Sequence, residues 1–401
     1  MKLLKISASG LPLFDQTCEI DFLATQRVSA DSTDKLSCLF SKATQSFYLN
    51  NVLSFIGINA SGKTTILKLI TFICKMLNNE SLNNISCNEI LDGVSEGDEV
   101  VFDTYFYAED NIHLLHTVVA KKKQKFVIKD EFLKAKQSTK VKNKADIFVF
   151  DESETLLTRN NDEAFLLDDV SIMIAFNKKI KDTLVVTDML QYTNTNQLKI
   201  SEDCPPELIA FFDPSVEYLR VKKNSKDTDI CLKFKGKEEI VLNHFSELNR
   251  YLSSGTIKGI NTFLNAIKTF EVGGYLIVDE LENHFNHEIV STLIRFYFDK
   301  KVNTNGAVMI FSTHYAEILD EFDRNDSIYI VRNRNGITAE NLSTILKRND
   351  IKKSEAYESG FLEGTVPMYD AYMKLKNSII RSRKEDWPWI FQNILPASMK
   401  G

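Results

Sequence analysis

Residues 57–64 combine side chains that bind phosphate with a backbone that can approach it closely. Gly57 and Gly62 bracket four residues and are followed by Lys63 and Thr64, which is the spacing of a phosphate-binding loop. The glycines let backbone N–H groups surround phosphate oxygens, the lysine reaches the β- and γ-phosphates, and the threonine hydroxyl binds Mg²⁺. The sequence therefore predicts a nucleoside triphosphate site with contacts from Gly57, Asn59, Ala60, Ser61, Gly62, Lys63, Thr64 and Thr65.

Such a loop must lie between a buried strand and a helix whose first N–H groups face the ligand. Residues 52–56, Val-Leu-Ser-Phe-Ile, are the short apolar run expected of the strand. Residues 65–77 carry apolar side chains at the spacing of a helix that packs on a sheet. Because both flanks fit, a chance glycine-rich turn is the weaker interpretation.

Two acidic residues end a second apolar run, residues 273–280. A continuous apolar run is typical of a parallel strand buried on both faces, and ligands bind open α/β sheets at the C-terminal ends of such strands. We therefore expect Asp279 to lie opposite Thr64 and either to bind Mg²⁺ directly or to hydrogen-bond a group that binds it. We expect Glu280 to orient and deprotonate an attacking water.

A third apolar run, residues 307–311, is followed by Ser312, Thr313 and His314. If this run is the neighbouring strand, its polar end lies in the same crevice, and His314 is predicted to hydrogen-bond the γ-phosphate.

The segment Leu252–Thr256 places small residues ahead of a helical pattern. Ser253, Ser254 and Gly255 are predicted to contact phosphate as a second anion site. A plain helix N-cap explains the same residues when they are taken alone.

Composition and charge set limits on the partners of this 401-residue chain. The net charge of −6 gives no overall attraction to nucleic acid. No run of about 18 apolar residues occurs, so we expect a cytoplasmic protein without a membrane partner. Lysines do cluster between residues 121 and 144, most densely at Lys121, Lys122, Lys123 and Lys125. A solvated hairpin is favoured there over a phosphate-backbone contact, because aromatic residues are sparse.

The four motifs, in this order along the chain, resemble those of the ABC-type ATPase fold. Residues 57–63 and the segment Asp279–His284 are similar to the soluble branch that includes RecF, SMC proteins and the overcoming-lysogenization (OLD) family. The resemblance extends most closely to the AAA-15/AAA-21 ATPases of bacterial abortive-infection and anti-phage systems, through Arg324–Tyr329 and Leu362–Pro367. The chain departs from that family at Phe285–His287, where Leu-His-Pro is usual. The position of the family's glutamine loop is open, and Gln124 is one candidate.

This resemblance implies an enzyme that binds ATP and Mg²⁺ and hydrolyses ATP. Two protomers would pair head to tail, with Ser253 and Gly255 of one protomer contacting the γ-phosphate held by Lys63 and His314 of the other. Larger assemblies are left open. No Asp-x-Asp follows His314, so we expect no intrinsic nuclease of the OLD type.

We expect an α/β fold of the ABC type with a mixed, largely helical insert between the phosphate loop and the Ser-Ser-Gly segment. The expected parts are a lobe at 1–150, the insert at 151–245, a second lobe at 246–340 and a C-terminal segment at 341–401 with an aromatic cluster at Trp387–Phe391. Strands are expected at 1–6, 19–22, 100–107 and 114–120, the last two paired.

Two functions fit these expectations. The first is a switch or sensor ATPase of an anti-phage system that controls a separate effector protein encoded nearby. The alternative is a RecF-like DNA-repair ATPase that binds duplex DNA through the lysines near residue 121.

Overall fold

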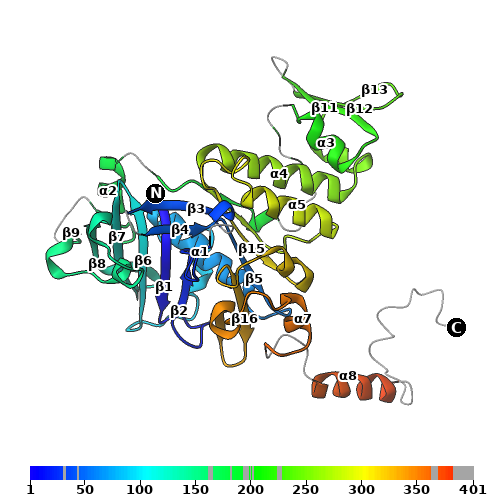
Figure 1. The fold of residues 1–401 in the computed structure, drawn as a ribbon. Coiled ribbons are helices and arrows are strands. Elements are labelled where there is room, and N and C mark those ends of the chain that lie inside the picture. Colours follow the sequence, from blue (N-terminus) through cyan, green and yellow to red (C-terminus); the bar gives the residue numbers. More distant parts are fainter. Residues whose placement is uncertain are drawn as a thin grey trace.

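The computed structural model describes residues 1–29, 33–42, 45–160, 166–180, 183–192, 198, 200, 203–223, 228–362 and 369–382. Its main feature is a helix, α1 (Lys63–Leu77), held between two six-stranded sheets (Figure 1). Side chains from α1 and from the facing sides of both sheets share one apolar core. The fold is therefore mixed α/β with parallel and antiparallel sheets, as predicted at this level.

The first sheet carries the three apolar runs identified in the sequence. Its order is β10 (Val186–Asp188), β14 (Tyr275–Val278), β15 (Val308–Thr313), β5 (Val52–Ile56), β16 (Ile328–Asn333) and β17 (Ile337–Asn341). All neighbours are parallel except β16 and β17. Every residue of β5, β14 and β15 is buried, because helices or the other sheet cover both faces. The C-terminal ends of these strands meet at one edge.

The second sheet is antiparallel throughout. Its order is β2 (Cys18–Asp21), β1 (Lys2–Ser9), β6 (Glu99–Ala108), β7 (Asn111–Lys122), β8 (Lys125–Gln137) and β9 (Thr155–Thr158). Buried residues alternate along β6, so one face packs inward, where Phe102 lies 5.7 Å from Phe72 of α1 between ring centres. The four strands predicted at 1–6, 19–22, 100–107 and 114–120 are confirmed as β1, β2, β6 and β7, and the last two are paired.

The opposite face of the parallel sheet is covered by α4 (Ser254–Val272) and α5 (His287–Phe298). Ile257, Ile260 and Phe263 of α4 join Leu276 and Met309 of the sheet in a second apolar core. This packing fixes the start of α4 relative to the edge where β14 and β15 end.

The expectation of a largely helical insert at 151–245 is wrong for the described residues. They include two short helices, α2 (Met173–Ile180) and α3 (Pro206–Phe212), and the strand β10, which forms the edge of the parallel sheet. They also include a small antiparallel sheet of β11 (Val216–Lys223), β12 (Thr228–Phe234) and β13 (Glu239–Leu242). β9 extends the antiparallel sheet past residue 150, and Met173 and Phe176 of α2 join the core around α1. The first lobe thus continues to about α2. Residues 230–234, which are strand-like in sequence, form most of β12, whereas β11 and β13 were not predicted.

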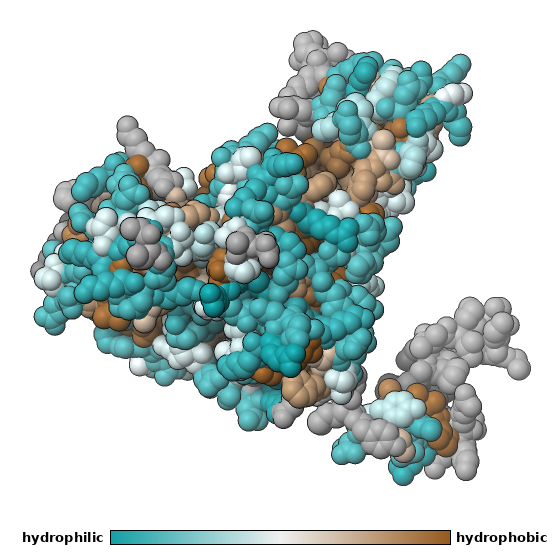
Figure 2. All heavy atoms as spheres, viewed as in Figure 1, coloured by the Kyte–Doolittle hydropathy of each residue, from teal (hydrophilic) through white to brown (hydrophobic). Residues whose placement is uncertain are grey.

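The module of α3 and β11–β13 rests on α4. A Cβ at Gly259 of α4 would lie only 2.2 Å from Cε1 of Phe212, so the absence of a side chain there permits the contact. Apolar residues gather on the surface where α3 meets α4 (Figure 2), and Phe211 is 45% exposed. The insert is therefore anchored on the helix that carries the Ser-Ser-Gly segment.

Four further helices and strands of the body and one separate helix complete the described secondary structure apart from short 3₁₀ turns. They are β3 (Leu36–Ser41) paired with β4 (Ser46–Asn50), α6 (Leu342–Ile345), α7 (Lys353–Glu358) and α8 (Tyr369–Ser382), which stands apart from the body in Figure 1. The aromatic cluster at Trp387–Phe391 lies outside the described residues. Within the described part of the chain, no helix has the length and apolarity needed to cross a bilayer.

Candidate functional site

The loop between β5 and α1 has a backbone that only small residues allow. Gly62 is left-handed at φ 99°, and Ala60 is left-handed at φ 62°. A Cβ at Gly57 would lie 2.4 Å from the carbonyl oxygen of Val331, and one at Gly62 would lie 2.6 Å from the Ile337 side chain. The β16–β17 hairpin therefore packs directly against the loop and holds it in shape.

Lys63 is almost completely buried, with 5% of its surface exposed. Its Nζ donates to the carbonyl oxygens of Gly57 at 2.9 Å and Ile58 at 3.1 Å. Burial lowers the pKa of Lys63, and nearby acids, Asp279 first, act in the opposite direction. The ammonium is thus held inside the loop, where a phosphate group would meet it.

Asp279 joins the loop helix to the two neighbouring strands. Its Oδ2 accepts a hydrogen bond from Thr64 Oγ1 at 2.8 Å, and its Oδ1 accepts one from Ser312 Oγ. Ser312 Oγ also lies 2.8 Å from the backbone N of Glu280 and accepts its N–H. The hydroxyl predicted for Mg²⁺ and the carboxylate predicted opposite it are therefore in direct contact.

Glu280 and His314 face each other across the edge of the sheet. His314 Nε2 lies 3.2 Å from Glu280 Oε1, and His314 Nδ1 lies 3.1 Å from Lys63 Nζ. An ionised Glu280 only accepts, so we assign the proton to Nε2, which leaves Nδ1 to accept from the Lys63 ammonium. In this tautomer the Gly57 carbonyl oxygen, 3.1 Å from Nδ1, receives no hydrogen bond from the ring. Glu280 has φ 47°, an uncommon conformation for a non-glycine residue and one that occurs at functional sites.

The residues present fit a phosphate group with Mg²⁺. Ser61 Oγ is buried and has no hydrogen-bond partner among the described residues, and Gly62 caps α1 without a side-chain acceptor for the first N–H groups. These unsatisfied donors, with Lys63, are what an anion at a helix N-terminus requires. Thr64 and Asp279 supply the oxygen atoms that Mg²⁺ prefers. No cluster of three or more His, Cys, Asp or Glu suited to a metal occurs in the described residues.

The Ser253–Gly255 segment starts α4 but does not join the loop site within the chain. Ser253 caps the helix, since its Oγ accepts from Thr256 N at 3.0 Å. Ser254 Oγ lies 3.3 Å from His284 Nδ1, and a Cβ at Gly255 would lie 2.6 Å from the His284 carbonyl oxygen. Among the described residues, no hydrogen bond joins this segment to residues 57–65. The N-cap interpretation is confirmed, and a phosphate contact in a second protomer stays a prediction.

Two residues near the site, Gln191 and Glu282, were not predicted from the sequence. The glutamine that was suggested, Gln124, lies elsewhere. Gln124 lies in the two-residue turn between β7 and β8, where its φ of 65° fits a hairpin turn. Gln191, in contrast, follows β10, which pairs in parallel with β14, so it lies at the same edge as Asp279. β10 is only three residues long, and the apolar run that leads into it, residues 184–186, is too short to indicate a buried strand. The second residue is Glu282, whose Oε1 accepts the backbone N–H of His314 at 2.5 Å.

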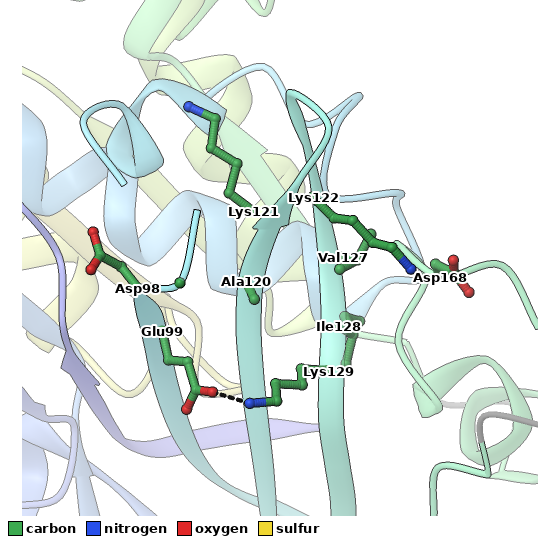
Figure 3. Close-up of a pocket in the computed structure, with 10 residues that line it drawn as sticks. Asp98, Glu99, Ala120, Lys121, Lys122, Val127, Ile128, Lys129 and Asp168 are labelled. Atoms are coloured by element: carbon green, nitrogen blue, oxygen red, sulfur yellow. Dashed lines mark hydrogen bonds and ion pairs between the residues drawn. The ribbon is translucent and has the colours of Figure 1, made fainter. Parts of the chain in front are cut away.

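Several lysines of the 121–144 cluster bind oxygen atoms within the chain, and Lys121 donates to the carbonyl oxygen of Val94. Lys136 donates to the carbonyl oxygens of Asp146 and Val149, and Lys144 to those of Ala24, Thr25 and Gln26. Lys129 pairs with Glu99 across a hollow of about 550 Å³ (Figure 3). That hollow is lined by Lys121 and Lys122 but also by Asp98 and Asp168. Its mixed charge does not favour a polyanion.

No protein-family model matches this chain, and neither does any curated protein. The resemblance to ABC-type ATPases therefore depends on the motifs and on the geometry above.

Proposed function

We propose that this chain is an ATPase of the ABC type that binds and hydrolyses ATP between two protomers. The observation that carries the proposal is the contact between Thr64 and Asp279, beside the buried Lys63. It brings the helix after a glycine-rich loop and the acidic end of β14 together at one sheet edge, where α/β proteins bind ligands. Gln191 at the same edge replaces Gln124 as the candidate glutamine-loop residue.

The chain's own residues divide the reaction between them. Lys63 and the first N–H groups of α1 bind the phosphates. Mg²⁺, held by Thr64 with Asp279 beside it, would neutralise charge on the β- and γ-phosphates. Glu280 accepts a proton from the attacking water, and His314, whose Nε2–H donates to Glu280 in this structure, would turn that N–H to the γ-phosphate.

The placement of Ser253–Gly255 supports a head-to-tail dimer. These residues have the donors of a helix N-terminus but contact His284 rather than the loop of their own chain. A second protomer turned head to tail would present them to the γ-phosphate. ATP would then hold the dimer together, and hydrolysis would release it, as expected of a switch.

We further propose that the switch acts in a bacterial anti-phage system and controls a separate effector protein. The support is the sequence resemblance of Asp279–His284 and of Arg324–Tyr329 to AAA-15/AAA-21 ATPases. Duplex DNA as the partner is less well supported, because the hollow that Lys121 and Lys122 line also carries Asp98, Glu99 and Asp168.

The test is expression of the chain from its native gene neighbourhood, with and without Lys63→Ala. The proposal expects a neighbouring gene product to copurify with the protein and phage plating to be reduced only by the unaltered protein. A chain that purifies alone and leaves plating unaffected by Lys63→Ala would contradict the defence role. ATP-dependent, salt-sensitive DNA binding by the purified chain would favour the alternative instead.

A further inference from the structure

Ser312, near the end of β15, bonds to both acids that follow β14. Its Oγ donates a hydrogen bond to Asp279 Oδ1, and the same oxygen accepts the backbone N–H of Glu280 at 2.8 Å. The Ser312 carbonyl oxygen accepts the next backbone N–H, that of Leu281, at 3.1 Å. One residue of β15 therefore binds three successive residues after the end of β14.

The direction of these hydrogen bonds is fixed by the charge on Asp279. An ionised carboxylate only accepts, so we assign the single proton of the Ser312 hydroxyl to the Asp279 contact. A lone pair of the same oxygen then faces the Glu280 N–H. In such a chain each hydrogen bond polarises the next, so a hydroxyl that donates to a carboxylate is a better acceptor. The charge of Asp279 thereby strengthens the hydrogen bond that holds the backbone of Glu280.

Glu280 depends on this hydrogen bond because its backbone has left the strand ladder. The pairing of β14 with β15 ends at Val278 and Phe311, and Glu280 then turns to φ 47°. A non-glycine residue keeps that conformation only where its surroundings impose it. The Glu280 N–H meets the Ser312 hydroxyl in place of a strand carbonyl. The conformation that presents the Glu280 carboxylate to His314 thus depends on a side chain of the neighbouring strand.

The Ser312 hydroxyl lies where water cannot replace it. Ser312 is 0% exposed, and Asp279 is only 7% exposed. Asp279 accepts from Thr64 through its other oxygen, so the Ser312 hydrogen bond fixes which oxygen faces the loop helix. Loss of the hydroxyl would remove a donor from the carboxylate and the acceptor from a backbone N–H at once.

We propose that Ser312 is a positioning residue that couples the two acids of the site. It orients Asp279 toward Thr64 and Mg²⁺, and it holds Glu280 in the conformation needed to accept a proton from water. This inference rests on the proposed ATPase function. The Lys63 ammonium and the first turn of α1 are held without Ser312, so ATP binding in the absence of Mg²⁺ should not depend on this residue.

The experiment compares Ser312→Ala with Ser54→Ala as a matched control. Ser54 lies in the adjacent strand β5, is also 0% exposed, and its Oγ has no hydrogen-bond partner among the described residues. Both variants lose a buried hydroxyl from the same sheet, but only Ser312→Ala loses hydrogen bonds to the acids. The comparison therefore separates loss of these hydrogen bonds from loss of any buried hydroxyl.

We expect Ser312→Ala to lower kcat at saturating Mg²⁺ and ATP about tenfold or more, because Glu280 is displaced. Calorimetric titration should show that the gain in ATP affinity from Mg²⁺ falls by at least about threefold, while the affinity in EDTA is unchanged. Thermal unfolding without nucleotide should occur at a lower temperature than in Ser54→Ala. Ser54→Ala should match the unaltered protein in kcat and in both affinities.

A double-mutant cycle with Glu280→Gln separates positioning from general damage. In that background the base is absent, so Ser312→Ala should lower kcat little further, while it still reduces the gain from Mg²⁺. Unchanged kcat in the single variant, an unchanged gain from Mg²⁺, or kcat losses that multiply would overturn the proposal. If Ser312→Ala does not fold, Ser312→Cys keeps the size with a weaker donor and should show smaller losses of both quantities. Full activity of that variant would equally overturn the proposal.

The unaltered protein distinguishes failure of this inference from failure of the proposed function. Absence of ATP hydrolysis by the unaltered protein would refute the proposed function. Hydrolysis at a rate that Ser312→Ala leaves unchanged would refute the positioning role alone.

Discussion

Thr64 Oγ1 donates a hydrogen bond to Asp279 Oδ2 at 2.8 Å, across 215 residues of sequence. The contact exists because β5 and β14 are placed on either side of β15, with their C-terminal ends at one edge. It brings a hydroxyl and a carboxylate, two oxygen groups suited to a hard cation, to the first turn of α1.

Replacing Thr64 by valine should weaken the Mg²⁺-dependent part of ATP binding. The change keeps the shape of the side chain but removes the hydroxyl, and a hydrogen bond to a charged group contributes about 1.5–3 kcal/mol, or roughly 10- to 100-fold. Titration calorimetry with ATP in Mg²⁺ and in EDTA measures the effect. Thr64→Ser keeps the hydroxyl and should retain the Mg²⁺ dependence, and equal loss in both variants would argue against this role.

Replacing Glu280 by glutamine should separate ATP binding from hydrolysis. The amide cannot accept the proton from water, so we expect kcat to fall by about 10²- to 10⁴-fold while affinity stays similar. Because ATP would then persist, light scattering should detect a dimer that the unaltered protein forms only transiently. A Glu280→Gln variant that hydrolyses ATP at the normal rate would exclude Glu280 as the base.

Replacing Gly62 by alanine should destabilise the fold at the loop. An alanine at φ 99° carries the left-handed cost of about 1–2 kcal/mol, and its Cβ would also meet the Ile337 side chain at 2.6 Å. Gly97→Ala is the matched control, since Gly97 has φ 100° and nothing within 4 Å of an added Cβ. Urea unfolding should show a larger loss for Gly62→Ala, and equal losses would show that the hairpin contact is unimportant.

His113 should make the protein less stable in mild acid. It stacks on Phe106 and meets Phe176 edge-on, and burial lowers its pKa from 6.5 to about 4. The unfolded chain therefore binds more protons than the native state between these values, so stability is complete above pH 6.5 and falls as the pH drops toward 4. The shift corresponds to roughly 3 kcal/mol.

Unfolding free energies of the unaltered protein and of His113→Phe, measured from pH 7 to pH 4, check this expectation. The variant should lose less stability over that range. His116→Phe should show the opposite pH dependence. The hydrogen bond to Asp103 raises the pKa of His116, so the stability that this histidine contributes is present at low pH and is lost as the pH rises. Parallel pH profiles for His113→Phe and the unaltered protein would contradict the assignment.

The sequence predicted the elements whose residues are buried on both faces. β5 has the predicted bounds, and β14 and β15 lie within a residue or two of them, because continuous apolar runs mark such strands. β10 could not be found in this way, because it is a three-residue, half-buried edge strand, defined only by its pairing with β14. Within the insert only residues 230–234 were strand-like in sequence, and the other strands of the small sheet are defined by pairing with β12 rather than by a local pattern.

The residues of the candidate site that follow apolar strands were predicted, and those placed by tertiary contacts were not. Lys63, Thr64, Asp279, Glu280 and His314 follow apolar strands, so the sheet brings them together as expected. Glu282 could not be recognised as a contact of His314, because that hydrogen bond depends on the left-handed turn at Glu280.

The most direct test of the account is calorimetric titration of the purified protein with ATP, in Mg²⁺ and in EDTA, beside Lys63→Ala. We predict saturable binding that is strengthened by Mg²⁺ and weakened at least about 100-fold by the loss of the Lys63 ammonium. Absence of Mg²⁺-dependent binding, or binding that Lys63→Ala leaves unchanged in a folded protein, would contradict the assignment of the β5–α1 loop as a nucleotide site.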